Sequence, residues 1–155
     1  MKFGITVSQI NEVDLVVQAE NAGYDFCWVW DSPMIRSNLW ALLALVAERT
    51  SRISIGPGVA IPALSMAPVT ANAIATINAI APGRTFLGVG TGNTALRAMG
   101  QVPMTIQALE AQLKVIRGLL AGETVAYEAN GINEDIAFQS LELGCINLDY
   151  CTGSV

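Results

Sequence analysis

The chain contains no histidine, and lysine occurs only as Lys2 and Lys114. A mechanism that needs an imidazole is therefore excluded within these residues. The formal net charge is −5, and no basic stripe or cluster of Lys and Arg is present. Such a chain does not attract nucleic acid or an anionic membrane surface, so we expect neither as a partner.

Cysteine and long apolar runs are scarce as well. Cys27, Cys145 and Cys151 lack the spacing or the histidine company of a zinc site, so we expect no metal site and place Cys27 in the core. The most apolar run, Leu39 to Ala47, is too short to cross a bilayer, and the N-terminus lacks the basic and apolar regions of a secretory signal. We therefore expect a cytoplasmic protein without a membrane span.

Hydrophobic residues are abundant, at 52% of the chain, whereas charged residues make up 14%. This balance suits a large core in which strands are buried on both faces. The length allows one domain with a substantial core.

The sequence repeats one unit four times, a short apolar strand followed by a helical pattern. The strands begin near Lys2, Phe26, Arg52 and Thr85. The four helices are expected from the N-cap Asn11 to Gly23, from after Asn38 to about Thr50, from Pro68 to before Pro82, and from after Thr105 to Gly122. Alternation of this kind predicts βαβ crossovers and a parallel sheet.

Two architectures fit four such units, an open doubly wound sheet and part of a (βα)8 barrel. In both, ligands bind at the C-terminal ends of the strands. Polar residues follow three of the strands at that end, namely Ser8, Gln9, Asp31, Ser32, Thr91 and Asn93. At the opposite end we interpret Arg52 and Arg84 as solvated or sheet-capping residues.

A glycine-rich turn, Gly88-Val89-Gly90-Thr91-Gly92-Asn93, follows the fourth strand. Glycines at alternate positions let the backbone approach a bound group, and Thr91 and Asn93 add hydrogen-bonding side chains. The spacing differs from the dinucleotide-binding pattern because position 93 is Asn. A turn that serves only tight packing of the strand on the next helix remains the alternative.

Four passages of the chain together resemble the luciferase-like monooxygenase superfamily of flavin- and deazaflavin-dependent oxidoreductases. The longest is the stretch from Pro82-Gly83-Arg84 through the glycine turn to Gly100, and the similarity covers about residues 1 to 138. The other three passages are Trp28-Val29-Trp30-Asp31-Ser32, Gly56-Pro57-Gly58-Val59-Ala60-Ile61-Pro62 and the segment 67–76.

The resemblance implies an α/β fold, the N-terminal half of a (βα)8 TIM barrel with about four βα units and the start of a β insertion. Residues 1–125 would form the half barrel and residues 126–155 the start of the insertion and a truncated tail. A whole barrel takes about 250 residues, so we expect an incomplete chain, through truncation, an interrupted frame or a split gene. Residues 143–149 resemble the approach to a fifth strand, whereas residues 150–155 lack the proline and apolar strand expected there.

The resemblance also implies a cofactor, coenzyme F420 (a deazaflavin) or FMN, at the C-terminal ends of the strands. The cofactor-binding residues would be Gly58, Val59, Gly90, Thr91, Gly92 and Asn93. In many deazaflavin-dependent members the third strand carries a bulge, often with a non-prolyl cis peptide, and by position Gly58 and Val59 would form it.

Asp31 would lie at the cofactor mouth as the catalytic acid or base; the alternative is an Asp that fixes its loop through backbone N–H groups. Ser32 and Asn93 stand where sugar-phosphate dehydrogenase relatives place His and Glu. We interpret Arg97 as a surface residue. The alternative, which we rank lower, is that Arg97 attracts a phosphate or carboxylate of the cofactor.

Three functions follow as hypotheses. The first is an oxidoreductase that acts on a small-molecule substrate by hydride transfer or monooxygenation, although this chain alone is expected to be inactive. The second is a noncatalytic half barrel that self-associates or pairs with a complementary half, since its first and fourth strands would have unpaired edges. The third is an open-sheet protein whose glycine turn binds a phosphate ester. The substrate, and the choice between F420 and FMN, are beyond what the sequence decides.

Overall fold

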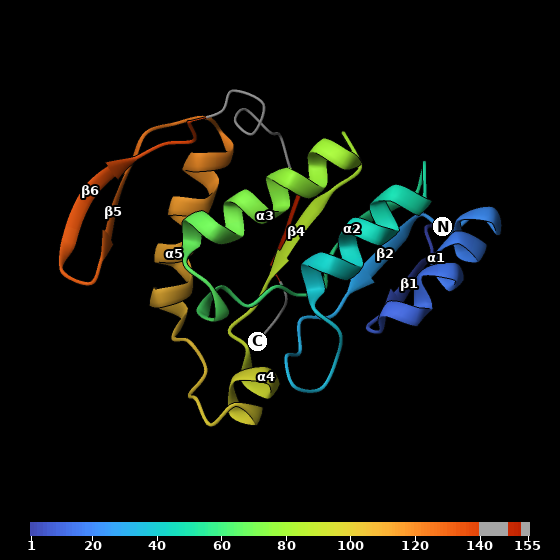
Figure 1. The fold of residues 1–155 in the computed structure, drawn as a ribbon, viewed down its shortest axis with the longest axis horizontal. Coiled ribbons are helices and arrows are strands. Elements are labelled where there is room, and N and C mark those ends of the chain that lie inside the picture. The colour runs from blue at the N-terminus through green and yellow to red at the C-terminus, as the bar shows by residue number, and fades with distance from the viewer. Residues whose placement is uncertain (140–148, 153–155) are drawn as a thin grey trace.

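In a computed structural model, which describes residues 1–139 and 149–152, strands and helices alternate along the chain (Figure 1). The four predicted strands are confirmed as β1 (Gly4–Val7), β2 (Phe26–Val29), β3 (Ser54–Pro57) and β4 (Phe86–Val89). The four predicted helices are confirmed as α1 (Val13–Asn21), α2 (Leu39–Arg49), α3 (Ala67–Ile80) and α5 (Ile106–Leu120).

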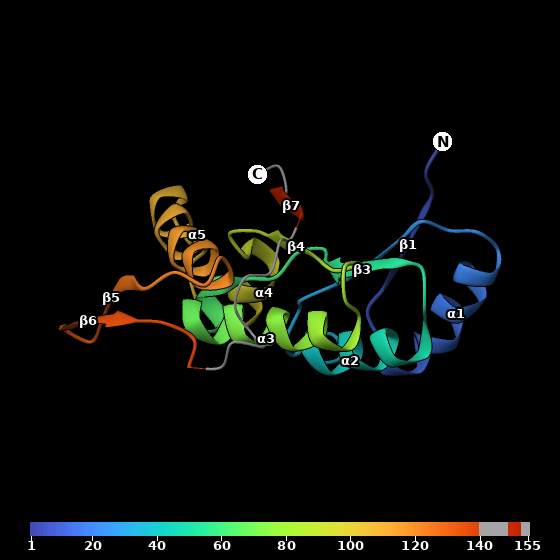
Figure 2. The ribbon, with the colours of Figure 1, turned by 90° about the horizontal axis from the view of Figure 1, so that it is seen from above.

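Several further elements connect these units. The 3₁₀ helices η1 (Ile10–Glu12) and η2 (Pro62–Leu64) follow β1 and β3, and the short helix α4 (Asn93–Ala98) follows β4. An antiparallel hairpin of β5 (Val125–Ala129) and β6 (Ile132–Ile136) comes after α5 and extends away from the sheet (Figures 1 and 2). Strand β7 (Asp149–Thr152) is the last described element.

The strands lie side by side in the order β1-β2-β3-β4-β7. β1, β2 and β3 form regular parallel pairs. β4 joins β3 through two parallel bridges, Ile55 with Thr85 and Ala60 with Val89. Helices α1, α2 and α3 lie on the same side of the sheet (Figure 2). Sequential parallel strands with helices on one side form the first half of a (βα)8 barrel rather than a doubly wound sheet, whose helices cover both faces.

Strand β7 corrects the expectation for the end of the chain. It pairs in parallel with β4, in a register that runs from Phe86 with Asp149 to Val89 with Thr152. The prediction that residues 150–155 contribute no strand is therefore wrong for residues 150–152, and β4 is not an unpaired edge. The reason is that sheet pairing uses backbone N–H and C=O groups, so the free edge of β4 accepts an extended segment without an apolar sequence. Residues 143–148, including Cys145, lie outside the described residues.

The core lies between the sheet and the helices. Side chains alternate along β1 and β2, so that Val7, Cys27 and Val29 are buried against the helices. Fully buried side chains of the helices meet them, among them Leu42, Leu43, Ile74, Ile116 and Leu120. Each such burial contributes roughly 1.5–3 kcal/mol. Cys27 is inside this core as predicted, and burial raises the pKa of its thiol to about 12.

The other face of the sheet carries an aromatic cluster. Phe26 and Trp28 alternate with the helix-facing residues of β2, and their ring centroids are 5.6 Å apart. Phe86 of β4 packs edge-on against both rings, at 6.2 and 6.1 Å. Three aromatic rings therefore lie on the face that is directed away from α1, α2 and α3.

Most of the predicted helix ends are confirmed. The side chain of Asn38 accepts from Ala41 N at 3.1 Å at the start of α2, and Thr105 caps α5 in the same way. Gly23 and Gly122, beyond the ends of α1 and α5, have left-handed φ values of 85° and 78°.

Two predicted helix starts differ from the structure. Asn11 is not an N-cap, because it lies inside η1, where the Glu12 carboxylate accepts from the backbone N of Ser8 and Gln9 at 2.7 and 2.8 Å. This local pairing stabilises a 3₁₀ turn before α1. Helix α3 begins one residue before Pro68, at Ala67, which leaves the proline in the first turn, where an N–H has no helical partner.

Three charged side chains, Glu20, Arg52 and Arg84, hold the N-terminal ends of the strands together. The buried Glu20 carboxylate accepts from the backbone N of Ser51, Arg52 and Ile53 at 2.6–2.9 Å. The Arg84 guanidinium donates to the carbonyls of residues 47, 50 and 53 at 2.7–3.2 Å, and Arg52 donates to the carbonyl of Glu20. The interpretation of Arg52 and Arg84 as structural residues is therefore confirmed.

None of the helices in the described part of the chain is both long and apolar enough to cross a membrane.

Candidate functional site

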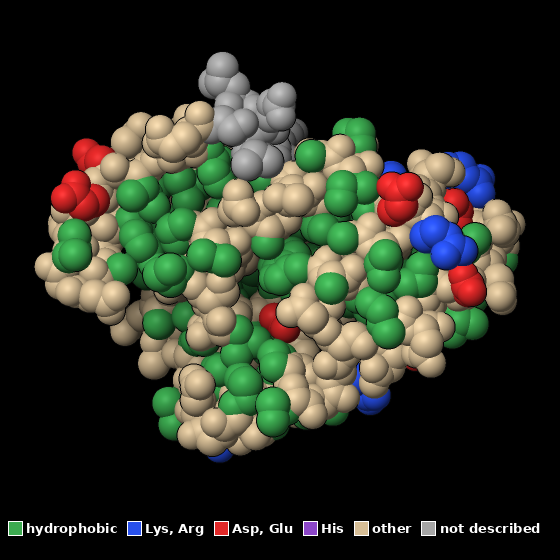
Figure 3. All heavy atoms as spheres, in the orientation of Figure 1, with side chains coloured by type: hydrophobic (Ala, Val, Ile, Leu, Met, Phe, Trp, Pro, Cys, Tyr) green, Lys and Arg blue, Asp and Glu red, His purple; other side chains and the backbone are tan. Residues whose placement is uncertain are grey.

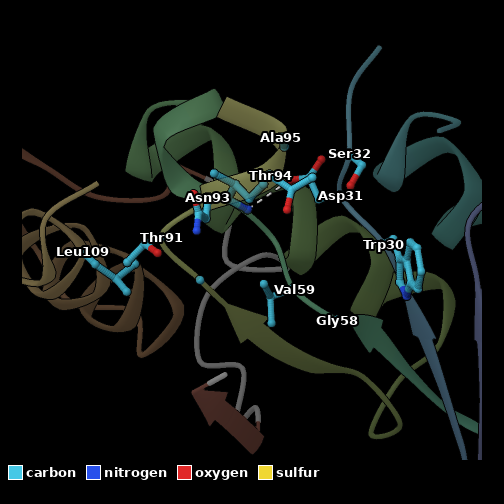
Figure 4. Close-up of a pocket in the computed structure, with 13 residues that line it drawn as sticks. Trp30, Asp31, Ser32, Gly58, Val59, Thr91, Asn93, Thr94, Ala95 and Leu109 are labelled. Carbon is cyan, nitrogen blue, oxygen red and sulfur yellow. Dashed lines mark hydrogen bonds between the residues drawn. The ribbon is translucent and has the colours of Figure 1, made fainter. Parts of the chain in front are cut away.

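A half-open cavity of about 370 Å³ lies at the C-terminal ends of β2, β3 and β4 (Figure 4). Its size is within the range of small-molecule sites. The lining comes from four segments of the chain: Trp30, Asp31 and Ser32; Gly58, Val59 and Ile61; Gly90 to Ala95; and Leu109 of α5. All seven predicted site residues, Asp31, Gly58, Val59, Gly90, Thr91, Gly92 and Asn93, line this one cavity.

The segment after β3 forms one wall. The Gly58–Val59 peptide bond is cis, at the place where the resemblance implied such a bulge. Gly58 N donates to Val29 O and Ala60 N donates to Gly88 O, both at 2.8 Å, so the segment passes from β2 to β4 across the cavity. A Cβ on Gly58 would lie 2.7 Å from Trp28 Cβ, so a side chain at position 58 would collide with β2. The Val59 side chain stands within the cavity (Figure 4).

The glycine turn after β4 forms the adjoining wall. Gly90 N donates to Ala60 O at 3.0 Å, and a Cβ on Gly90 would lie 2.6 Å from Val59 Cγ2. Gly92 has a left-handed φ of 79°, and a Cβ there would collide with Ile61. The glycines therefore do serve tight packing. The same packing brings their backbone to the cavity surface, so the two interpretations of this turn are compatible.

Asp31 lies where β2 ends, and its carboxylate points across to the wall after β3 (Figure 4). Asp31 Oδ2 accepts from the backbone N of Ile61 at 3.0 Å. Burial raises the pKa of the Asp31 carboxyl above its ordinary value, and the hydrogen bond from Ile61 offsets part of that rise. The bond from Ile61 N is the loop-fixing contact expected if Asp31 has a structural role. The raised pKa of the same carboxyl means that it keeps its proton to higher pH, as a catalytic acid or base requires.

Asn93 and Arg97 form a pair at the edge of the cavity. Asn93 is the first residue of α4, and Arg97 Nε donates to its Oδ1 at 2.6 Å. Both residues are exposed, and of the two only Asn93 lines the cavity.

Six lining residues were not among the predicted site residues, namely Trp30, Ser32, Ile61, Thr94, Ala95 and Leu109, although Ser32 was expected at this end of the sheet. Trp30 and Ile61 stand within the quoted motifs, so proximity to Asp31 and Val59 could have indicated them. Leu109 has the helical spacing of a core residue, and only the packing of α5 beside the turn after β4 brings it to the cavity. Ser8 and Gln9 do not line this cavity, because they follow β1 at the edge of the sheet, whereas the cavity lies at the ends of β2, β3 and β4.

Within residues 1–139 and 149–152, no group of three or more Cys, Asp or Glu side chains could hold a metal ion.

Comparison with known sequences gives one family. The family described as luciferase-like monooxygenase matches residues 7–140. The chain is 32% identical over 152 residues to a 5,10-methylenetetrahydromethanopterin reductase of Archaeoglobus fulgidus, a match that covers 93% of this chain and 44% of the relative. It is 36% identical over 133 residues to an F420-dependent glucose-6-phosphate dehydrogenase of Kineococcus radiotolerans, covering 77% of this chain and 40% of the relative.

Comparison with solved structures gives the same fold. A coenzyme F420-dependent tetrahydromethanopterin reductase from Methanopyrus kandleri superposes with a TM-score of 0.76 at 23% identity, over 99% of this chain and 50% of the other. The FMN complex of the oxygenating constituent of 3,6-diketocamphane monooxygenase from Pseudomonas putida gives 0.75 at 19% identity, over 92% and 45%. The chain thus spans about half the length of the proteins it matches.

Proposed function

Since the chain belongs to the luciferase-like monooxygenase family, we propose that it supplies the N-terminal half of the barrel of a flavin- or deazaflavin-dependent oxidoreductase. The proposed reaction on a small-molecule substrate is hydride transfer or monooxygenation. The observation that carries this proposal is the cavity in which Asp31, the Gly58–Val59 bulge and the Gly90–Asn93 turn meet. Residues 1–125 would be the half barrel and residues 126–155 the beginning of a β insertion.

The residues of the cavity fit a planar ring with a polar edge. Val59 and Ile61 offer apolar contact, and the turn from Gly90 to Gly92 offers backbone without bulky side chains. Asn93 and Thr91 provide hydrogen-bonding groups beside it, and Asp31 provides an acceptor or, when protonated, a donor. A flat tricyclic ring needs this combination of a smooth apolar wall and a few polar groups at its rim.

We assign the cofactor as coenzyme F420 or FMN, with Gly58, Val59, Gly90, Thr91, Gly92 and Asn93 as the residues that hold it. When bound, the cofactor supplies a centre that carries a hydride or, for FMN, activates oxygen. The part of this chain is to pack Val59 against one face of the ring, to approach it with the glycine backbone and to bind its rim through Asn93.

Asp31 is the proposed catalytic acid or base. Ile61 N holds one carboxylate oxygen, which fixes the orientation of the group at the cavity wall. Because burial raises its pKa, the carboxyl keeps a proton at a pH where an exposed Asp has lost it. A group of this kind can give a proton to a bound substrate or take one from it.

A second candidate function is a noncatalytic half barrel that associates with a complementary half or with itself. Within the described residues the outer edge of β1 has no strand partner, while its inner edge pairs with β2. The chain also spans about half the length of its relatives. A partner with free parallel strands would complete the sheet next to β1.

Titration of the chain with FMN and with coenzyme F420, followed by visible absorbance, tests the first proposal. Thr91→Arg places a long charged side chain in the cavity, and we expect it to abolish binding of the cofactor that the parent binds. Thr76→Arg, the same change on the exposed face of α3, is the matched control and should leave the dissociation constant unchanged. Equal effects of the two variants, or no binding of either cofactor by the parent, would contradict the proposed site.

A further inference from the structure

Arg97 distinguishes the two ends of the Asn93 carboxamide. Arg97 Nε lies 2.6 Å from Asn93 Oδ1, one turn along α4. An arginine Nε carries a hydrogen and offers no acceptor, so the Asn93 atom beside it has to be the carbonyl oxygen. The amide nitrogen, with two N–H donors, is therefore the opposite end of the group.

That donor end belongs to the cavity. Asn93 lines the cavity, and Figure 4 shows its nitrogen turned away from α4 towards the open space beside Val59. Within the described residues, Asn93 Nδ2 has no hydrogen-bond partner. Without Arg97 the carboxamide could rotate by half a turn and present its oxygen instead, since both ends have similar shape.

We propose that Arg97 is a positioning residue, which turns Asn93 so that its amide N–H groups bind a carbonyl or anionic oxygen of the ligand in the cavity. This inference rests on the proposed function, because the rim of a flavin or deazaflavin ring carries such carbonyl oxygens. Arg97 acts here through Asn93 and does not touch the ligand.

A direct electrostatic role of Arg97, attraction of a ligand phosphate, makes a different prediction from a positioning role. A direct role would persist when Asn93 is replaced, and a lysine at position 97 would preserve it. A positioning role disappears when Asn93 is replaced. It is weakened in Arg97→Lys, because the flexible lysine ammonium, which is also a donor, holds the carboxamide less rigidly than the planar Nε–H.

The experiment measures the dissociation constants of FMN and coenzyme F420 for the parent, Asn93→Ala, Arg97→Ala, Arg97→Lys and the double variant Asn93→Ala/Arg97→Ala. We expect each single variant to weaken binding roughly three- to tenfold, the range of one net hydrogen bond. The double variant should bind no more weakly than Asn93→Ala. Additive losses, or full rescue by Arg97→Lys, would overturn the positioning role in favour of direct attraction. Both residues are exposed, so the variants should keep the fold.

A readout without ligand separates this proposal from the proposed function. In nitrogen-15 NMR spectra, the Arg97 Nε–H should exchange with water more slowly than that of Arg36, and Asn93→Ala should abolish the difference. Equal exchange in the parent overturns the pairing whichever cofactor binds. Failure of the parent to bind either compound overturns the proposed function, whereas binding that Arg97→Ala leaves unchanged overturns the positioning role alone.

Discussion

Two carboxylates, the half-buried Asp31 and the buried Glu20, have pKa values shifted in opposite directions. Burial raises the pKa of both groups, but Asp31 accepts one backbone N–H, from Ile61, whereas Glu20 accepts three, from residues 51 to 53. Three donors outweigh the desolvation of Glu20, and Arg52 adds a favourable charge, so its pKa lies below the ordinary value. The number of N–H donors thus distinguishes the two groups. Asp31, with one donor, is suited to proton transfer, whereas Glu20, with three, is suited to holding the chain together.

Asp31→Asn is predicted to change how stability depends on pH. The raised pKa means that the folded protein holds the Asp31 proton more tightly than the unfolded chain does. The destabilisation therefore begins as pH rises through the unfolded pKa and is complete above the folded pKa. Asparagine can still accept from Ile61 N but does not ionise. We expect the variant to gain stability relative to the parent as pH rises from acidic to neutral, measured by urea unfolding; a constant difference would contradict the raised pKa.

Glu20 is predicted to act in the opposite sense. Because its pKa is lowered, its stabilisation is fully present above the unfolded pKa and is lost as pH falls through the folded pKa. Glu20→Ala leaves three backbone N–H groups without their acceptor and should cost about 2–4 kcal/mol of unfolding free energy at neutral pH. Glu20→Gln should lose less and should flatten the acidic limb of the stability profile. Glu48→Gln, at an exposed position on α2, is the control and should leave the profile unchanged.

At the level of elements, close approach of β3 and β4 builds the walls of the cavity. A Cβ on Gly56 would collide with the backbone oxygen of Phe86, so glycine is required where these strands adjoin. Beyond this contact β3 leaves regular pairing, and Ala60 takes up hydrogen bonds with Gly88 and Gly90. Regular pairing between the two chain segments is interrupted between the bridges Ile55 with Thr85 and Ala60 with Val89. In this interruption the Gly58–Val59 bulge faces the cavity.

The helix that follows the Asp31 loop depends on its N-cap. Asn38 Oδ1 accepts from Ala41 N at the start of α2, whose side chains Leu39, Leu42 and Leu43 are fully buried. Asn38→Ala removes this acceptor and should lower the unfolding free energy by about 1 kcal/mol. Asn72→Ala, at an exposed position inside α3, makes the same substitution without a cap and should be neutral or slightly stabilising. Thermal or urea unfolding measures the stability of both variants. Equal losses in the two would show that Asn38 does not stabilise α2 as an N-cap.

At the level of the whole molecule, the surface is unevenly apolar. On the face in Figure 3, charged side chains gather mainly near α1 and α2 and at the β5–β6 hairpin, whereas apolar side chains spread over α3 and α5. Phe3 and Ile106 are each 56% exposed. Within the described residues the outer edge of β1 has no strand partner, and the exposed Phe3 lies directly before this strand, so the β1 edge favours association with another chain.

Self-association is therefore predicted for the isolated chain, through the edge of β1. Size-exclusion chromatography with light scattering should show a mass that rises with protein concentration. Thr6→Lys places a charge on the exposed edge strand and should shift the mass towards the monomer, because charged edge residues oppose strand pairing. Thr76→Lys on α3 is the matched control and should have no effect. A parent that stays monomeric at every concentration would contradict the prediction.

Local signals in the sequence were sufficient for the order of the elements and for most helix ends. Alternating apolar strands and periodic helices, with Asn38, Thr105, Gly23 and Gly122 at helix ends, depend on interactions within a few residues. The cavity residues were also predicted together, since parallel βα units place the ends of all strands at one edge. The prediction of Asn11 as an N-cap was wrong because the Glu12 side chain binds the backbone N–H groups of the same turn. A preference of Asn for N-cap positions does not reveal this competing contact.

Only the tertiary structure decided the features that depend on distant partners. Pairing of β7 with β4 uses backbone groups, which leave no trace in the side-chain pattern. Burial at the cavity wall raises the pKa of Asp31, whereas N–H donors about 30 residues away along the chain, at residues 51 to 53, lower the pKa of Glu20. Leu109 reaches the cavity because α5 packs beside the turn after β4. Contacts of this range are set by how the units stack, and no local pattern encodes them.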